Sequence, residues 1–135
     1  MDTSDAKNLI ELLTSRSAAW NSLWTMFYTV AAAIVGVIAS GKLVSGHHIE
    51  ASLIAAFGFL VFAAGNYRAL DEMRKQREAV VEFVKCKARE ENSREIETLA
   101  VASSPPSATD LKKYHWTLSV FVVALLLLIP YYSGK

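Results

Sequence analysis

Charged residues are absent from three long stretches of the chain and concentrated in the segments between them. The uncharged stretches are residues 23–40, 51–65 and 116–134. A helix needs about 17–25 mostly apolar residues to cross roughly 30 Å of hydrocarbon. The second stretch reaches that length only when residues 49–67 are counted, which puts Glu50 at one membrane interface and Asn66 at the other. The pattern predicts an all-α integral membrane protein with three transmembrane helices.

The predicted organisation alternates membrane spans with polar segments. An amphipathic cytoplasmic segment covers residues 1–19, and the first two spans are 20–40 and 49–67, joined by a short external loop, 41–48. A charged cytoplasmic helix (68–100) and a Pro/Ser linker (101–110) follow. A short cap and the third span occupy 111–132, and an external tail covers 133–135. We expect residues 3–16 either to lie on the inner leaflet as a short helix or to extend the first span into the cytoplasm.

The distribution of basic residues predicts the orientation. Lys and Arg accumulate in short cytoplasmic loops. The loop between the second and third spans carries most of them, whereas the loop between the first two contains only Lys42. We therefore expect the N-terminus and the long loop to be cytoplasmic and the C-terminus to be external, in the cell's inner (plasma) membrane. The basic residues of the long loop are Arg68, Arg74, Lys75, Arg77, Lys85, Lys87, Arg89, Arg94, Lys112 and Lys113.

The charged segment reads "RALDEMRKQREAVVEFVKCKAREENSREIE" and is rich in strong helix formers. Opposite charges recur at helical spacing, as in Asp71 with Lys75. We expect one helix from residue 68 to about 98, either continuing the second span or folded back as a hairpin. Pro105 and Pro106 end it, and Thr109 or Asp110 is expected to cap the helix that follows.

An apolar stripe along this helix requires something to cover it. The candidates are the same chain, sister chains or a different cytoplasmic protein. We favour a cytoplasmic protein partner, because the sequence offers no obvious intramolecular mate. The residues predicted to dock that partner are Leu70, Met73, Val80, Val81 and Val84.

Small residues recur at a spacing of four in the first two spans, which allows another helix to approach closely. The first span carries Ala32, Gly36 and Ser40; the second carries Ala51 with Ala55, and Ser52 with Ala56. We expect these faces to pack against each other within one chain. The alternative is that one stripe faces another subunit, which would give a homo-oligomer.

Composition narrows the chemistry. The 135 residues have room for one domain, and 14 basic against 13 acidic residues give a net charge of +1, so a nucleic-acid partner is not expected. The single cysteine, Cys86, cannot form an internal disulfide. We find no catalytic or cofactor-binding motif, and therefore expect neither enzymatic activity nor a cofactor.

Two further groups of residues each allow two interpretations from sequence. His47, His48 and Glu50 gather near the start of the second span, where they would form a metal or pH-sensing site or simply a polar interfacial loop. Asn66 and Arg68 would either bind a lipid phosphate or anchor the helix at the interface.

In layout, residues 20–98 are similar to the bacterial defence effectors called SLATT proteins. That resemblance implies a two-helix membrane hairpin with a long cytoplasmic helix, acting as a membrane-disrupting or pore-forming effector. The third predicted span departs from the family's layout.

The sequence thus predicts a small non-enzymatic membrane subunit. It would oligomerise in the bilayer and engage a cytoplasmic partner through helix 68–98, as a membrane effector or anchor of a bacterial defence-type system. The alternative is a homo-oligomeric channel or pore-forming protein. Its lining would come from polar residues of the first span, which we expect not all to share one helix face: Asn21, Ser22, Thr25, Thr29 and Ser40.

Overall fold

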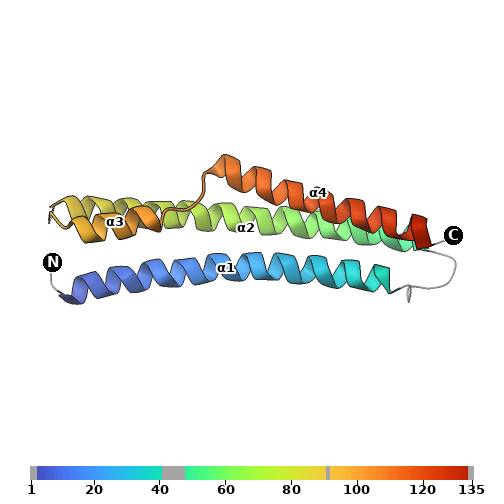
Figure 1. The fold of residues 1–135 in the computed structure, drawn as a ribbon, viewed down its shortest axis with the longest axis horizontal. Coiled ribbons are helices and arrows are strands. Elements are labelled where there is room, and N and C mark those ends of the chain that lie inside the picture. Colours follow the sequence, from blue (N-terminus) through green and yellow to red (C-terminus); the bar gives the residue numbers. More distant parts are fainter. Residues whose placement is uncertain (1–2, 41–47, 91, 134–135) are drawn as a thin grey trace. The chain divides into compact units, whose positions relative to one another are not determined.

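The computed structural model describes residues 3–40, 48–90 and 92–133, and every regular element within them is a helix. The helices are α1 (Thr3–Ala39), α2 (His48–Glu90), α3 (Arg94–Ala102) and α4 (Ala108–Ser133) (Figure 1). In this part of the chain, α1, α2 and α4 are each long and apolar enough to cross a membrane. The all-α fold with three such helices confirms the coarse prediction from sequence.

Both α1 and α2 are longer than the spans that they contain. The N-terminal segment is continuous with α1 from Thr3, so of the two arrangements open from sequence the structure has the helical extension. The charged segment likewise continues the second span as one helix as far as Glu90. These charged residues have high helix propensity, and no Gly or Pro interrupts them after Gly65, so the helix has no local reason to stop at Tyr67.

The charged segment is not one helix from 68 to about 98: it continues the second span as far as Glu90, and the chain then folds back as α3 from Arg94, which combines the two arrangements left open from sequence. The backbone N–H of Asn92 donates to the carbonyl of Arg89 (3.2 Å), and that of Ser93 donates to the carbonyl of Ala88 (2.9 Å). Asn92 has φ of 54°. This pair of bonds with a left-handed residue is a Schellman motif, which closes a helix and reverses the chain. Asn is among the few non-Gly residues that adopt this conformation readily.

The connection between α3 and α4 is shorter than the expected linker, 101–110, because α3 ends at Ala102 and α4 begins at Ala108. Ser103 caps α3 through its N–H to the carbonyl of Leu99 (3.0 Å), and Pro105 and Pro106 follow after Ser104. Because α4 begins at Ala108, Thr109 and Asp110 lie in its first turn and are not its caps.

The chain divides into two compact units, to each of which α1 and α2 contribute one segment. The charged unit consists of Met1–Leu23 and Ala69–Ala108; the apolar unit consists of Trp24–Arg68 and Thr109–Lys135.

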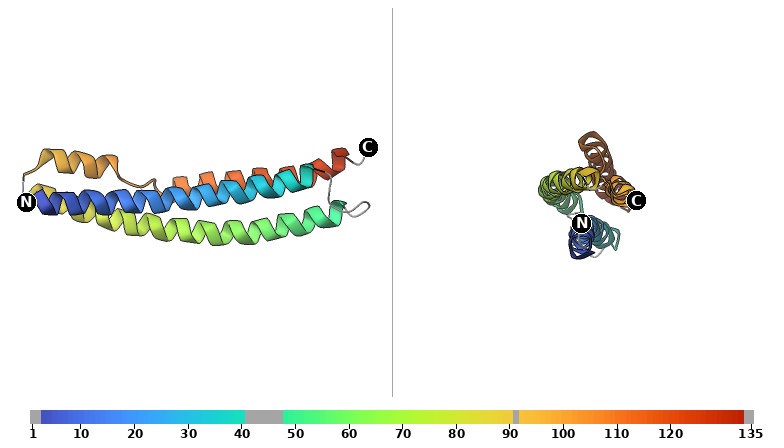
Figure 2. Two further views of the ribbon diagram at one scale, coloured as in Figure 1. Left: turned by 90° about the horizontal axis from the view of Figure 1, so that it is seen from below. Right: turned by 90° about the vertical axis from the view of Figure 1, so that its left-hand side faces the viewer.

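The apolar unit is a bundle of three helices that run side by side (Figure 2). Its core is built at helical spacing from all three: Phe27 and Ala31 of α1, Ala56, Phe59 and Ala63 of α2, and Val122 and Leu126 of α4. Phe59, Ala63 and Leu126 are completely covered. The small side chains of α2 let the aromatic ring of Phe27 enter the bundle and lie 5.7 Å from that of Phe59.

In the charged unit, α3 folds back and packs with α1 and α2. The shared core consists of Leu13 of α1, Val81 and Val84 of α2, and Ala100 of α3. Two polar contacts hold the same helices: Arg16 Nη1 donates to Gln76 Oε1 (2.9 Å), and Arg89 Nε pairs with Glu97 Oε1 (3.0 Å).

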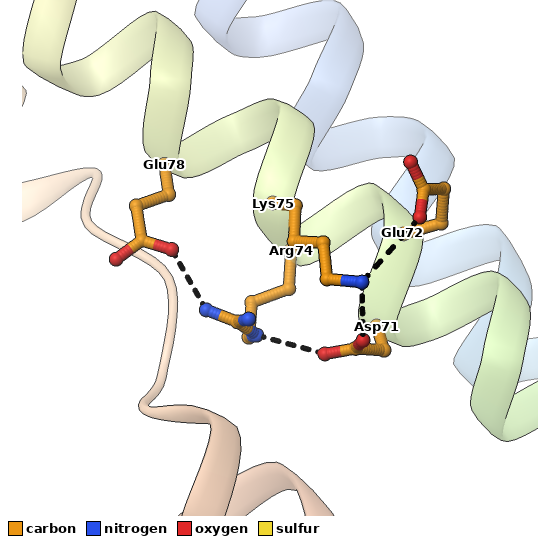
Figure 3. A network of polar contacts seen from close by, with 5 residues as sticks. All are labelled: Asp71, Glu72, Arg74, Lys75 and Glu78. Carbon is orange, nitrogen blue, oxygen red and sulfur yellow. Dashed lines mark hydrogen bonds and ion pairs between the residues drawn. The ribbon is translucent and has the colours of Figure 1, made fainter.

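The first turns of the charged part of α2 carry a network of ion pairs within one helix (Figure 3). Arg74 pairs with Asp71 (3.1 Å) and Glu78 (2.8 Å), and Lys75 pairs with Asp71 (3.0 Å). The hydrogen bond from Lys75 lowers the pKa of the Asp71 carboxyl. Pairs at this spacing support a single helix in water, and they need no partner protein to satisfy their charge.

Candidate functional site

A stripe of small side chains on α1 faces away from the bundle core. We define the α1 stripe as Thr25, Thr29, Ala32, Gly36 and Ser40, all of which are exposed. At about 100° per residue, the five positions fall within roughly 80° of the helix circumference. A methyl group placed on Gly36 would meet no heavy atom within 4 Å, apart from its own helix backbone.

The opposite side of α1 packs into the bundle. Phe27 and Ala31 are buried there, and Ile34 packs against them. The expectation that the small faces of the first two spans pack against each other is therefore wrong for α1, since Ala32 and Gly36 point outward. It holds for α2 in that Ser52 and Ala56 are buried. Phe27 and Ile34, on the side of α1 that faces the core, fill the interior of the bundle, so the α1 stripe lies outside it.

The residues expected to line a pore also lie on the exposed side of α1. Thr25, Thr29 and Ser40 belong to the α1 stripe, and Asn21 and Ser22 are exposed as well. The expectation that these positions do not share a face is wrong, because at about 100° per residue they span roughly a quarter to a third of the circumference.

Sequence does not predict a buried polar cluster in the apolar unit, since it places Asn66 at the membrane interface and His115 in the segment 111–132 that holds the short cap and the third span. The side chain of His115 is 0% exposed, and that of Asn66 is also buried. His115 Nε2 lies 3.4 Å from Asn66 Oδ1, and Ser119 Oγ donates to the His115 carbonyl (2.9 Å). His115 Nδ1 is buried with no hydrogen-bond partner in the described structure. The contact joins α2 to α4 across 49 residues of sequence, which no local pattern could reveal.

Aromatic rings from all three helices surround the His115 ring. Its centroid lies 4.7 Å from that of Phe27, 5.5 Å from Tyr67, 5.8 Å from Trp24 and 6.0 Å from Trp116. The apolar enclosure strengthens the contact with Asn66, because no water competes for it. The cluster thus holds the end of the bundle where α4 begins.

Most of the stripe predicted to dock a partner is covered by the chain itself. Val81 and Val84 are buried in the core of the charged unit, with Val80 packed against it. Leu70 is buried and Met73 is half-buried. In this conformation these side chains are therefore packed within the chain and are not available to a partner protein. The large apolar side chains that the charged unit leaves exposed include Phe83, Leu99 and Val101.

The other sequence candidates are only partly within the described structure. His47 lies outside the described residues, and the side chain of His48 is likewise outside them; Glu50 is exposed on α2. Among the described residues, no three His, Cys, Asp or Glu side chains gather in a group that could hold a metal ion. Ala51 and Ala55 are half-buried on α2.

Comparison of the chain with protein-family models, with curated proteins and with solved structures gives no match.

Proposed function

We propose that the protein is a non-enzymatic integral membrane subunit whose copies assemble in the bilayer through the α1 stripe. The observation that carries the proposal is the outward position of Ala32 and Gly36, directly opposite the face of α1 that packs in the core. A monomer would expose this face to lipid.

The physical reason lies in how helices associate in lipid. Lipid tails are as apolar as Leu, so large apolar side chains gain little by leaving them for another helix. Small residues instead let two backbones approach closely and gain van der Waals contact, and hydroxyl groups such as that of Thr29 can form hydrogen bonds between helices. Gly36 offers the open surface that such an approach requires.

The charged unit is proposed to lie in the cytoplasm and to engage a partner protein, in the orientation given by the basic residues between α2 and α4. Because Val81 and Val84 are occupied, the exposed side chains of Phe83, Leu99 and Val101 are the better candidates for that contact. A role as a membrane effector or anchor of a bacterial defence-type system fits the layout of a membrane hairpin with a long charged helix.

Replacement of Gly36 tests the assembly proposal, and the chain supplies a matched control. Gly58 is also helical and exposed, and a Cβ added there likewise meets nothing within 4 Å. We expect Gly36→Leu to reduce the mass of the nanodisc-embedded particle to that of one chain, and Gly58→Leu to leave the oligomer intact. An oligomer of equal mass in both variants would contradict the proposed interface.

A homo-oligomeric pore is the second candidate, and the shared face of Thr25, Thr29 and Ser40 favours it. An assembly with this face directed to a central axis would be lined by hydroxyl groups, whereas the bundle of a single chain is closed by Phe27 and Phe59. Planar-bilayer conductance distinguishes the two functions. Currents that change in ion selectivity when Thr29 is replaced by Asp would support the pore, and an oligomer that stays silent across triggers and voltages would support the subunit.

A further inference from the structure

The outer surface of α4 carries a shallow, open and mainly apolar hollow close to the start of the helix, within the apolar unit. Its volume is about 520 Å³, and it is lined by Lys112, Lys113, Trp116, Thr117 and Val120. Neither the α1 stripe nor the buried cluster includes these residues, although Trp116 contacts the cluster.

The lining changes from charged to apolar along the helix axis. The two lysines stand in the second turn of α4, Trp116 and Thr117 follow one turn later, and Val120 one turn after that. Eight residues of helix rise by about 12 Å. A phospholipid presents the same order over a comparable distance, with an anionic phosphate, then the polar glycerol esters, then hydrocarbon.

The ring of Trp116 is held in place before any ligand arrives. Its centroid lies 6.2 Å from that of Tyr67 on α2 and 6.0 Å from that of His115 on its own helix. Trp116 is half-buried, so one side of the indole packs on the bundle while the remainder borders the hollow. An indole fixed beside a cationic rim is the arrangement that suits a membrane interface, because its ring is apolar and its N–H is polar.

The charge of this turn favours an anion. Both lysines are exposed, and none of the five lining residues is acidic; Asp110, in the turn before them, is already engaged in an interaction. We propose that the hollow binds the headgroup of an anionic phospholipid, with the two ammonium groups on the phosphate and an acyl chain along Trp116 and Val120. In the orientation proposed above, this surface faces the cytoplasmic leaflet, where anionic lipids are concentrated.

Tryptophan quenching by brominated lipids tests this proposal on the full-length protein. The chain has three tryptophans, so the number of emitters stays constant when only lysines are changed. In nanodiscs, we expect brominated phosphatidylglycerol to quench more strongly than brominated phosphatidylcholine at equal mole fraction. In Lys112→Gln/Lys113→Gln, the preference should fall about ten- to thirty-fold, given roughly 1 kcal/mol per basic residue near an anionic surface.

Two controls make the result decisive. Lys85→Gln/Lys87→Gln removes the same charge from the charged unit and should keep the preference. Inorganic phosphate should change the lipid preference no more than chloride of equal ionic strength does, because a free ion makes no contact with the apolar part of the hollow. Equal quenching by the two lipids in the wild type, an unchanged preference in the Lys112/Lys113 variant, or a selective loss in phosphate would each overturn the proposal.

Discussion

The charged unit and the apolar unit place polar and apolar side chains in opposite ways. The charged unit buries a small apolar core around Val81 and Val84, and its surface carries ion pairs such as those of Arg74. At the surface of the apolar unit, by contrast, large apolar side chains are exposed, among them Phe57 (71%). Its interior contains four buried polar side chains: Ser52, Asn66, His115 and Ser119.

This difference indicates that the charged unit suits water and the apolar unit suits hydrocarbon. In water, apolar area is removed from the solvent and charges remain outside. In hydrocarbon, a polar group facing outward has no partner, whereas inside the bundle Asn66 contacts His115 and Ser119 donates to the His115 carbonyl. One continuous helix, α2, changes from the second arrangement to the first at about Arg68, which makes the boundary testable by paired substitutions on the same helix.

The largest expected effect comes from a charge placed in the core of the charged unit. Val84 is 1% exposed, whereas its neighbour Phe83 is 56% exposed. Val84→Asp buries an unpaired carboxylate, which should destabilise the packing of α3 by roughly 3–5 kcal/mol. Hydrogen exchange of residues 94–102 would report it as a loss of protection. Phe83→Asp should leave that protection nearly unchanged, and equal losses in both variants would argue against the described core.

The next largest effect tests whether the exposed surfaces of the two units face different solvents. Phe57 lies near the middle of residues 49–67 and is exposed on the bundle, so we expect Phe57→Arg to cost about 3 kcal/mol of apparent insertion free energy. Phe83→Arg is the same substitution at an exposed Phe of the charged part of α2 and should cost almost nothing. The measurement is the membrane-integrated fraction of the full chain in a translocon assay. Similar fractions for the two variants would mean that the two exposed surfaces face the same medium.

The buried cluster should contribute a smaller energy. We expect a double-mutant cycle with Asn66→Leu and His115→Phe to give a coupling of about 0.6 kcal/mol, and at most about 1.7, as for hydrogen bonds between other membrane helices. Unfolding of the protein in bicelles measures it. Ser52→Ala is the control, because Ser52 Oγ is buried without a hydrogen-bond partner in the described structure. Its removal should be neutral or stabilising, and a coupling of zero would contradict the contact between α2 and α4.

The ion-pair network should give the smallest effect. Because Lys75 lowers the pKa of Asp71 in the folded helix, the contribution is complete above the ordinary Asp pKa and is lost as the pH falls through the lowered one. The stability of the wild type should therefore fall slightly in acid, while Asp71→Asn should lack that component. NMR titration of the Asp71 carboxyl resonance against pH checks the direction, and high salt should weaken the effect.

Sequence predicted those parts of the fold that depend on local composition. Residues 23–40 and 116–134 are apolar over enough length to define their helices without reference to the rest of the chain. The composition of the charged segment predicts helix for the same reason, and a hairpin is among its possible arrangements, but the composition does not locate the break after Glu90. That break depends on the left-handed backbone of Asn92, which most Asn residues do not adopt.

The candidate sites were harder to predict, because they depend on which faces meet. The spacing of Ala32 and Gly36 indicated a close helix contact but could not show that Phe27 and Ala31 occupy the core face instead. Likewise, Val81 and Val84 required a partner, and sequence alone could not show that Leu13 and Ala100 provide it. The pairing of His115 with Asn66 depends on the packing of α4 against α2.

Spin labels at residues 57 and 83 test the central claim most directly. With Cys86 replaced by Ser, each label is placed through a single Phe→Cys change, and collision with oxygen is compared with collision with a water-soluble nickel complex in nanodiscs. We predict that the label at 57 meets oxygen preferentially, as in hydrocarbon, and that the label at 83 meets the nickel complex, as in water. A label at 57 that is reached by the nickel complex as readily as the label at 83 would show that the apolar unit does not lie in the membrane.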